Sequence, residues 1–169
     1  QPSWWIAHAL RHVRRALRRL DTPDPASVVR LLNIELAHMA LMRRALDNGA
    51  DWALVLEDDA SAPELDDCAD GILGLLTCGP APAYVNVSAS FSLDDLGVRH
   101  LVRPVQGVTW AGSVSRAVLA SSRPITNTVC AILYRRSFLE RLLPALEAVP
   151  REPVLPIDWK LNQALMDLW

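Results

Sequence analysis

Five apolar residues, Trp52 to Leu56, are followed at once by three adjacent acidic residues, Glu57, Asp58 and Asp59. A short, continuous apolar run of this length is typical of a strand that is buried on both faces of an α/β sheet. Adjacent carboxylates repel one another and resist burial unless they are paired or bind a metal. We therefore expect an inner strand that ends at an open cleft, with the three acidic side chains lining that cleft.

Helical and extended patterns alternate along the rest of the chain. Helices are expected over residues 3–20, 25–48, 63–76 and 137–148, and again from residue 158 onward. Strands are expected over residues 52–56, 84–87, 98–105 and 129–134, and residues 106–126 are expected to form a loop with some extended parts. This alternation predicts one α/β domain over residues 1–169, with a mostly parallel central sheet flanked by helices.

Several element ends carry recognisable capping residues. Pro25 suits the first position of a helix, and Gly49 suits the position just after its carboxyl end. Ser137 and Glu140 have the spacing of a capping box at the start of another helix. Asp158 is a favoured residue for capping the final helix, and this role alone would explain its presence.

The charge of the chain is unevenly distributed, although the net value is only −2. Residues 47–95 contain eleven acidic residues and no Lys or Arg, and the flanking stretches are both basic. Such a field can hold a divalent cation and then an anionic ligand, whereas solvated acidic loops are the simpler alternative. Because side chains alternate along an extended chain, Glu57 and Asp59 project to the same side. Their oxygen atoms suit Mg²⁺ or Mn²⁺, together with the oxygen atoms of a diphosphate.

Several of these segments resemble glycosyltransferase family 25, which includes bacterial lipopolysaccharide-type sugar transferases and collagen galactosyltransferases. The segments are residues 35–42, 52–60, 130–136 and 156–159, in the order and at roughly the spacing of that family. Ala37 stands where the family usually has Ser. The first strand of the family's GT-A fold, which helps to hold the nucleotide base, is not apparent before Ser3. The resemblance therefore implies a GT-A-like domain that is incomplete at its amino terminus, with this strand either absent or encoded before Gln1.

The resemblance implies a metal-dependent enzyme that transfers a sugar from a nucleotide-sugar donor, a UDP-sugar, to a hydroxyl group of a glycan. The setting would be cell-surface polysaccharide or lipopolysaccharide synthesis in a bacterium, and inversion at the anomeric carbon is the family expectation. Glu57 and Asp59 would hold Mn²⁺ or Mg²⁺, and Asp158 would be the general base. Asp58, His38 and Asn127 would contact the donor, a role implied for these positions by the resemblance.

Simpler interpretations remain open for two of these residues. His38 on a packed helix is often only a hydrogen-bonded core residue, because histidine has an intermediate tendency to be buried. Asn127 either orients the sugar or only satisfies the backbone.

Two other classes of protein compete with this interpretation. A haloacid-type phosphatase would place an Asp nucleophile directly after the strand, where this chain has Glu57. An inactive glycosyltransferase-like domain that binds a glycan or a partner protein is the non-enzymatic alternative. Binding of Mn²⁺ together with a nucleoside diphosphate would distinguish an enzyme of the expected kind from a binding module.

The expected amino-terminal helix carries five Arg residues between Arg11 and Arg19. This face is either simply solvated or suited to anionic lipid head groups. The longest apolar runs are far shorter than the ~20 residues that cross a bilayer, and no signal segment opens the chain. We therefore expect a cytoplasmic protein, and the lipid alternative adds peripheral contact at the inner membrane face. Nucleic acid is not an expected partner, because the chain is acidic and shows no aromatic stacking platform.

Overall fold

The computed structural model describes residues 25–58, 60, 65–77, 82–87, 99–110, 116–121, 126, 129–151 and 154–168. The expected amino-terminal helix with Arg11 and Arg19, together with Asp59 and Asn127, lies outside these residues. The elements, in chain order, are α2 (Pro25–Asp47), β1 (Trp52–Leu56), α3 (Leu65–Thr77), β2 (Tyr84–Asn86), η1 (Arg99–Leu101), β3 (Val102–Trp110), β4 (Arg116–Ser121), β5 (Ala131–Arg135), α4 (Arg136–Ala148) and α5 (Ile157–Leu168).

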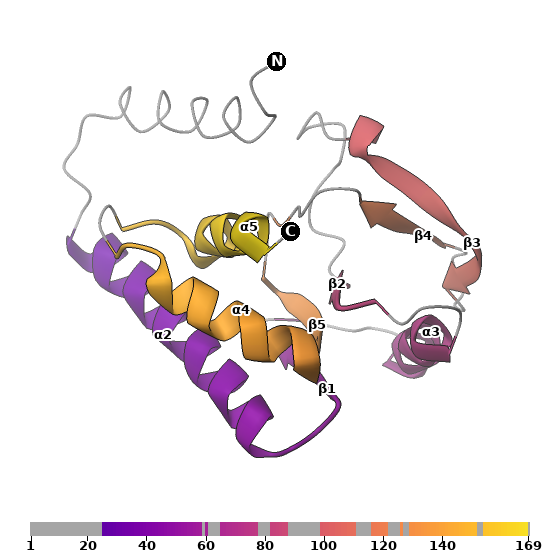
Figure 1. The fold of residues 1–169 in the computed structure, drawn as a ribbon, viewed down its shortest axis with the longest axis horizontal. Coiled ribbons are helices and arrows are strands. Elements are labelled where there is room, and N and C mark those ends of the chain that lie inside the picture. The colour runs from indigo at the N-terminus through magenta and orange to yellow at the C-terminus, as the bar shows by residue number, and fades with distance from the viewer. Residues whose placement is uncertain are drawn as a thin grey trace.

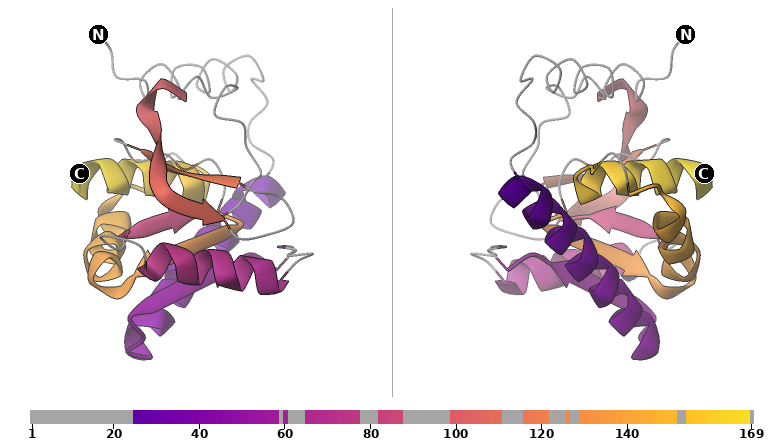
Figure 2. Two further views of the ribbon diagram at one scale, coloured as in Figure 1. Left: turned by 90° about the vertical axis from the view of Figure 1, so that its right-hand side faces the viewer. Right: turned by 90° about the vertical axis from the view of Figure 1, so that its left-hand side faces the viewer.

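The described strands form two small sheets. One sheet has the strand order β1-β5-β2, and the other is the pair β3-β4. Helices α2, α4 and α5 lie on one side of the three-stranded sheet, and α3 lies on the side where β3 and β4 are found (Figures 1 and 2). Helix α4 packs against both α2 and α5, whereas α3 packs against β3.

The prediction of a mostly parallel central sheet is wrong. Strand β5 pairs antiparallel with β1 on one side and antiparallel with β2 on the other. Strands β1 and β2 therefore run in the same direction, as a strand–helix–strand unit requires, but they do not pair with each other. Strand β5 enters the gap between them from the opposite direction, after the chain has passed through the antiparallel pair of β3 and β4.

The expected inner position of the 52–56 strand is also wrong within the described part of the chain. Strand β1 lies at the edge of its sheet, and β5 is the central strand. Leu54 and Leu56 are 43% and 50% exposed, whereas Val55 between them is buried. The strand therefore buries only one face, which an unbroken apolar run did not indicate.

The core lies between the three-stranded sheet and the layer of α2, α4 and α5. Each element contributes its apolar face, and the fully buried centre includes side chains from the central strand and all three helices. Its largest apolar members are Met42, Ile132, Tyr134, Leu139, Leu142, Leu146 and Leu161. This packing holds α2 and α5 against the sheet, and these two helices carry His38 and Asp158.

Local sequence signals predicted some element ends and missed others. Helix α2 begins at Pro25 as expected, and Gly49 follows it with a positive φ of 73°, a conformation that glycine adopts without strain. The capping box at Ser137 is wrong, because α4 begins one residue earlier and its N-cap, Arg135, has no side-chain capping bond. Glu140 instead pairs with Arg136 at 3.1 Å. Strand β4 and the end of β3 lie within residues 106–126, where a loop with some extended parts was expected.

Within the described residues, no helix is both long enough and apolar enough to cross a membrane.

Candidate functional site

Glu57 lies immediately beyond the carboxyl end of β1. Its backbone N–H donates a hydrogen bond of 2.9 Å to the carbonyl of Cys130, so the ladder between β1 and β5 continues for one residue past the strand. The chain then turns, because the N–H of Ala60 bonds to the carbonyl of Glu57 at 3.1 Å. The Glu57 side chain is 25% exposed, and Asp58 is exposed. The backbone pairing therefore fixes the position of the Glu57 Cα atom, and the carboxylate of Glu57 remains in contact with solvent.

His38 reaches Glu57 from the buried face of α2. The imidazole Nε2 lies 3.7 Å from Oε1 of Glu57, and the residue is only 4% exposed. Burial lowers the pKa of His38 below its ordinary 6.5, and the charge and hydrogen bonding of Glu57 oppose this only in part. The imidazole is therefore neutral near pH 7. Its buried Nδ1 atom has no hydrogen-bond partner among the described residues.

Asp158, the third of these predicted site residues, is a partly buried carboxylate in α5. Burial raises the pKa of Asp158 from 3.8 to about 6, against the opposing effect of the backbone N–H groups of Trp159 and Asp158. The charge of Glu57 adds to the increase in this pKa. Helix α5 begins at Ile157, so Asp158 lies inside the first turn, one residue past the start of the helix. Of the three predicted site residues on these elements, His38 therefore contacts Glu57, and Asp158 lies within the range of the Glu57 charge.

A buried hydrogen-bond network adjoins Asp158, and the sequence did not reveal it. The hydroxyl groups of Tyr84 and Thr126 share a hydrogen bond. Asn162 accepts the backbone N–H of Thr126 at 2.8 Å and donates its side-chain amide to the carbonyl of the same residue. Burial raises the pKa of Tyr84, the Thr126 hydrogen bond opposes this, and the charge of Asp158 adds to the rise. The network therefore joins Tyr84 of β2 and Thr126 to Asn162 of α5, the helix that carries Asp158.

A buried ion pair is a second feature that the sequence did not reveal. Lys160 Nζ lies 2.5 Å from Oε2 of Glu35, and the two side chains are 0% and 6% exposed. Both residues have the ordinary helical neighbours of a surface Lys and Glu, so composition gives no sign of their burial. Spacing gives no signal for Lys160 either, because residues two apart on a helix, such as Asp158 and Lys160, do not face each other.

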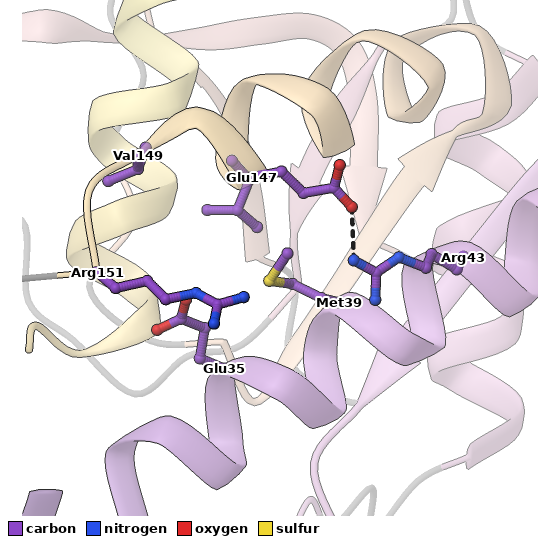
Figure 3. A pocket seen from close by; sticks show the side chains of 7 residues that line it. Glu35, Met39, Arg43, Glu147, Val149 and Arg151 are labelled. Carbon is purple, nitrogen blue, oxygen red and sulfur yellow. Dashed lines mark hydrogen bonds and ion pairs between the residues drawn. The ribbon is translucent and has the colours of Figure 1, made fainter.

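A cleft of about 240 Å³ lies elsewhere, between α2 and the end of α4 (Figure 3). Its lining comprises Glu35, Met39, Arg43, Leu146, Glu147, Val149 and Arg151. Arg43 and Glu147 in its wall pair with each other at 2.5 Å, as the dashed line shows. Neither Glu57 nor Asp158 lines this cleft. Its charges are mixed and largely paired, so we place the candidate site at Glu57 and not in this cleft.

The residues around Glu57 can be compared with what a metal ion requires. Within the part of the chain that the structure describes, no group of three or more His, Cys, Asp or Glu side chains is arranged to hold a metal. Asp59 lies outside the described residues. A Mg²⁺ or Mn²⁺ ion at a diphosphate site needs only one or two carboxylates, because phosphate and water supply its other oxygens. The partly exposed carboxylate of Glu57 fits a site of this kind, in which the protein supplies few ligands. It does not fit a site in which protein side chains enclose the ion on all sides.

Comparisons with known proteins found no matching family model, no matching curated protein and no matching solved structure. The functional interpretation therefore depends on the residues of the site and on the resemblance carried by their sequence motifs.

Proposed function

We propose that this chain forms a glycosyltransferase domain that transfers a sugar from a nucleotide-sugar donor, a UDP-sugar, to a glycan hydroxyl group. One observation carries the proposal. His38 lies 3.7 Å from Glu57 just beyond the carboxyl end of β1, and the charge of Glu57 adds to the increase in the pKa of Asp158 on α5. Ligands of α/β proteins are commonly found beyond the carboxyl ends of strands.

Asp158 has the properties that a general base needs. Its pKa of about 6 leaves the carboxylate ionised at neutral pH but close enough to that pH to accept a proton readily. In the proposed reaction, Asp158 removes the proton of the acceptor hydroxyl as that oxygen bonds to the anomeric carbon of the donor. The bond from this carbon to the diphosphate breaks, and the nucleoside diphosphate leaves with the electron pair.

Glu57 and Asp59 are the proposed ligands of Mn²⁺ or Mg²⁺, which, when bound, neutralises charge on the diphosphate leaving group. The neutral imidazole of His38 can donate its Nε2 proton toward Glu57 without adding a positive charge. His38 would in this way hold the Glu57 carboxylate in one orientation, and Asp58 and Asn127 would contact the donor. A place at the inner face of the membrane, with the Arg11–Arg19 segment on anionic lipid, belongs to the same proposal.

The test uses the full-length parent protein, Mn²⁺ and a panel of nucleotide sugars, with release of nucleoside diphosphate as the measured product. Asp158→Asn is expected to lower turnover about 10²–10⁴-fold while donor binding persists, because a general base acts on the acceptor proton. Asp167→Asn removes an exposed carboxylate from the same helix and serves as the matched control. Glycan binding by a chain that neither binds nor cleaves any donor would instead favour the non-catalytic binding domain.

A further inference from the structure

The ion pair between Lys160 and Glu35 is buried to an unusual degree. Nζ and Oε2 are 2.5 Å apart, and neither side chain is more than 6% exposed. Taking two charges out of water costs about as much free energy as their attraction returns, and a buried pair can often be replaced by apolar residues without loss of stability. Stability alone therefore does not account for a Lys and a Glu at this position.

The pair links the two helical turns that carry site residues. Glu35 lies three residues before His38 on α2, and Lys160 lies two residues after Asp158 on α5. Helix α4 packs against both helices, but the ion pair joins α2 directly to the first turn of α5. The backbone of this turn also bonds to the residue before the helix, because the N–H groups of Trp159 and Lys160 both reach the carbonyl of Pro156.

We propose that Lys160 and Glu35 are positioning residues whose ion pair holds the carboxylate of Asp158 in register with His38 and Glu57. The pair thereby controls turnover at the site and contributes little to the stability of the fold. This inference rests on the proposed function, and a measurement that does not need activity separates the two. A short, dry ion pair defines one relative position of two helices, whereas apolar contacts tolerate small sliding movements.

The decisive variant removes both charges together, so that neither charge is left buried alone. Glu35→Gln with Lys160→Met keeps similar volumes and neutralises the pair. The exposed pair of Arg43 and Glu147 is a matched control, because it also starts on α2, has the same N–O distance of 2.5 Å, and has side chains that are 50% and 41% exposed. The control variant is Arg43→Met with Glu147→Gln, and the reversed pair Glu35→Lys with Lys160→Glu tests for rescue.

The neutralised variant is expected to unfold within a few degrees of the unmodified protein. Its kcat should fall about 10- to 100-fold with an unchanged donor KM, because small displacements of a catalytic group cost this much. The control should keep its kcat, and the reversed pair should regain most of the loss. A neutralised variant with the kcat of the control, or a reversed pair that folds without regaining kcat, would overturn the inference.

Amide hydrogen exchange on the full chain gives the readout that is independent of activity. The neutralised variant should lose protection over residues 157–161 and keep it in α4, and the control should keep it in both. Unchanged protection over residues 157–161 would overturn the inference even if the enzyme were active. If the unmodified chain neither binds nor cleaves any donor, the proposed function is refuted but the role of the ion pair is not. The hydrogen-exchange result then still tests whether the ion pair holds the first turn of α5. If the neutralised variant does not fold, Glu35→Asp with Lys160→Arg is used in its place. This variant keeps both charges but shifts the position of the ion pair, and the same losses of kcat and of protection over residues 157–161 are expected.

Discussion

Replacing Asp158 with Asn is expected to stabilise the fold at pH 8 and to leave it nearly unchanged at pH 4. The pKa of this carboxyl is about 6 in the folded chain, against an ordinary value of 3.8. The folded state therefore holds the proton more tightly than the unfolded state does. Stability is highest while the group is protonated in both states, falls as the pH rises from about 4 through 6, and stays reduced above that range. The amide that Asp158→Asn introduces does not titrate, so the variant does not lose stability over that range.

The size of the effect follows from the same pKa. A change from 3.8 to about 6 corresponds to at most about 3 kcal/mol, at ~1.4 kcal/mol for each tenfold change in the acid constant. Partial contact with solvent reduces this value, and we expect about 2 kcal/mol at pH 8. In a chain of this length, that difference raises Tm by about 4–8 °C. The assay is thermal unfolding at pH 4 and pH 8 in the presence of a chelator, with Asp167→Asn as the control.

The competing interpretation predicts the opposite sign. If Asp158 only caps α5, its charge stabilises the amino end of the helix, by about 0.3–1 kcal/mol. Asp158→Asn would then lower Tm at pH 8. A lower Tm at pH 8, or a difference from the unmodified protein that is the same at both pH values, would show that burial does not raise the pKa of Asp158. A gain in stability together with a loss of turnover is the usual property of a residue kept for function.

Three further predictions concern other parts of the chain. Asp59→Asn should lower the initial rate of transfer at low Mn²⁺, because it removes one charge from the metal site, and a higher Mn²⁺ concentration should restore part of the rate. Full activity of this variant at low Mn²⁺ would show that Asp59 is not a ligand. Burial lowers the pKa of His38, so its contribution to stability is present above pH 6.5 and is lost as the pH falls below that value. His38→Gln should therefore reduce the loss of unfolding free energy between pH 6.5 and pH 5 in urea titrations, and an unchanged pH profile would contradict this. Anionic vesicles should retain the protein through the Arg11–Arg19 segment at low salt and release it at high salt, because the Debye length is only ~8 Å at physiological salt; equal binding to neutral vesicles would remove the membrane contact.

The elements that local chemistry determines could be predicted from the sequence. Pro25 and Gly49 mark the two ends of α2 because each has a backbone preference that acts within a few residues. The run from Trp52 to Leu56 is apolar enough to form a strand in almost any α/β fold, and it forms β1. The position of Glu57 at the carboxyl end of that strand follows directly.

Strand direction and strand position could not be predicted in the same way. Both depend on where β5 inserts, and β5 meets β1 and β2 only through pairings between residues far apart in the chain. The apolar character of Leu54 and Leu56 suggested burial on both faces, but hydrophobicity is no proof of burial, and these two residues are partly exposed at a sheet edge.

The sequence motifs pointed to His38, Glu57 and Asp158 but not to their surroundings. The structure places His38 3.7 Å from Glu57, and the assignment of these residues to a functional site stays a prediction. The sequence gives no sign that Lys160 is buried, because only the folded chain brings Glu35 to it. The bonds from Asn162 to Thr126 likewise depend on the packing of α5 and have no local signature.

The metal-dependent donor site is tested most sharply by calorimetric titration of the full-length protein with UDP, with and without Mn²⁺. We expect saturable binding in the presence of Mn²⁺ and a loss of at least about tenfold in affinity when the metal is chelated, because diphosphate and carboxylates share the ion. Glu57→Gln should weaken the Mn²⁺-dependent binding to the same low level, whereas Asp51→Asn, at an exposed acid just before β1, should leave it intact. Binding of UDP that is equally strong with and without Mn²⁺, or that survives Glu57→Gln unchanged, would contradict a metal-dependent nucleotide-sugar site at the end of β1.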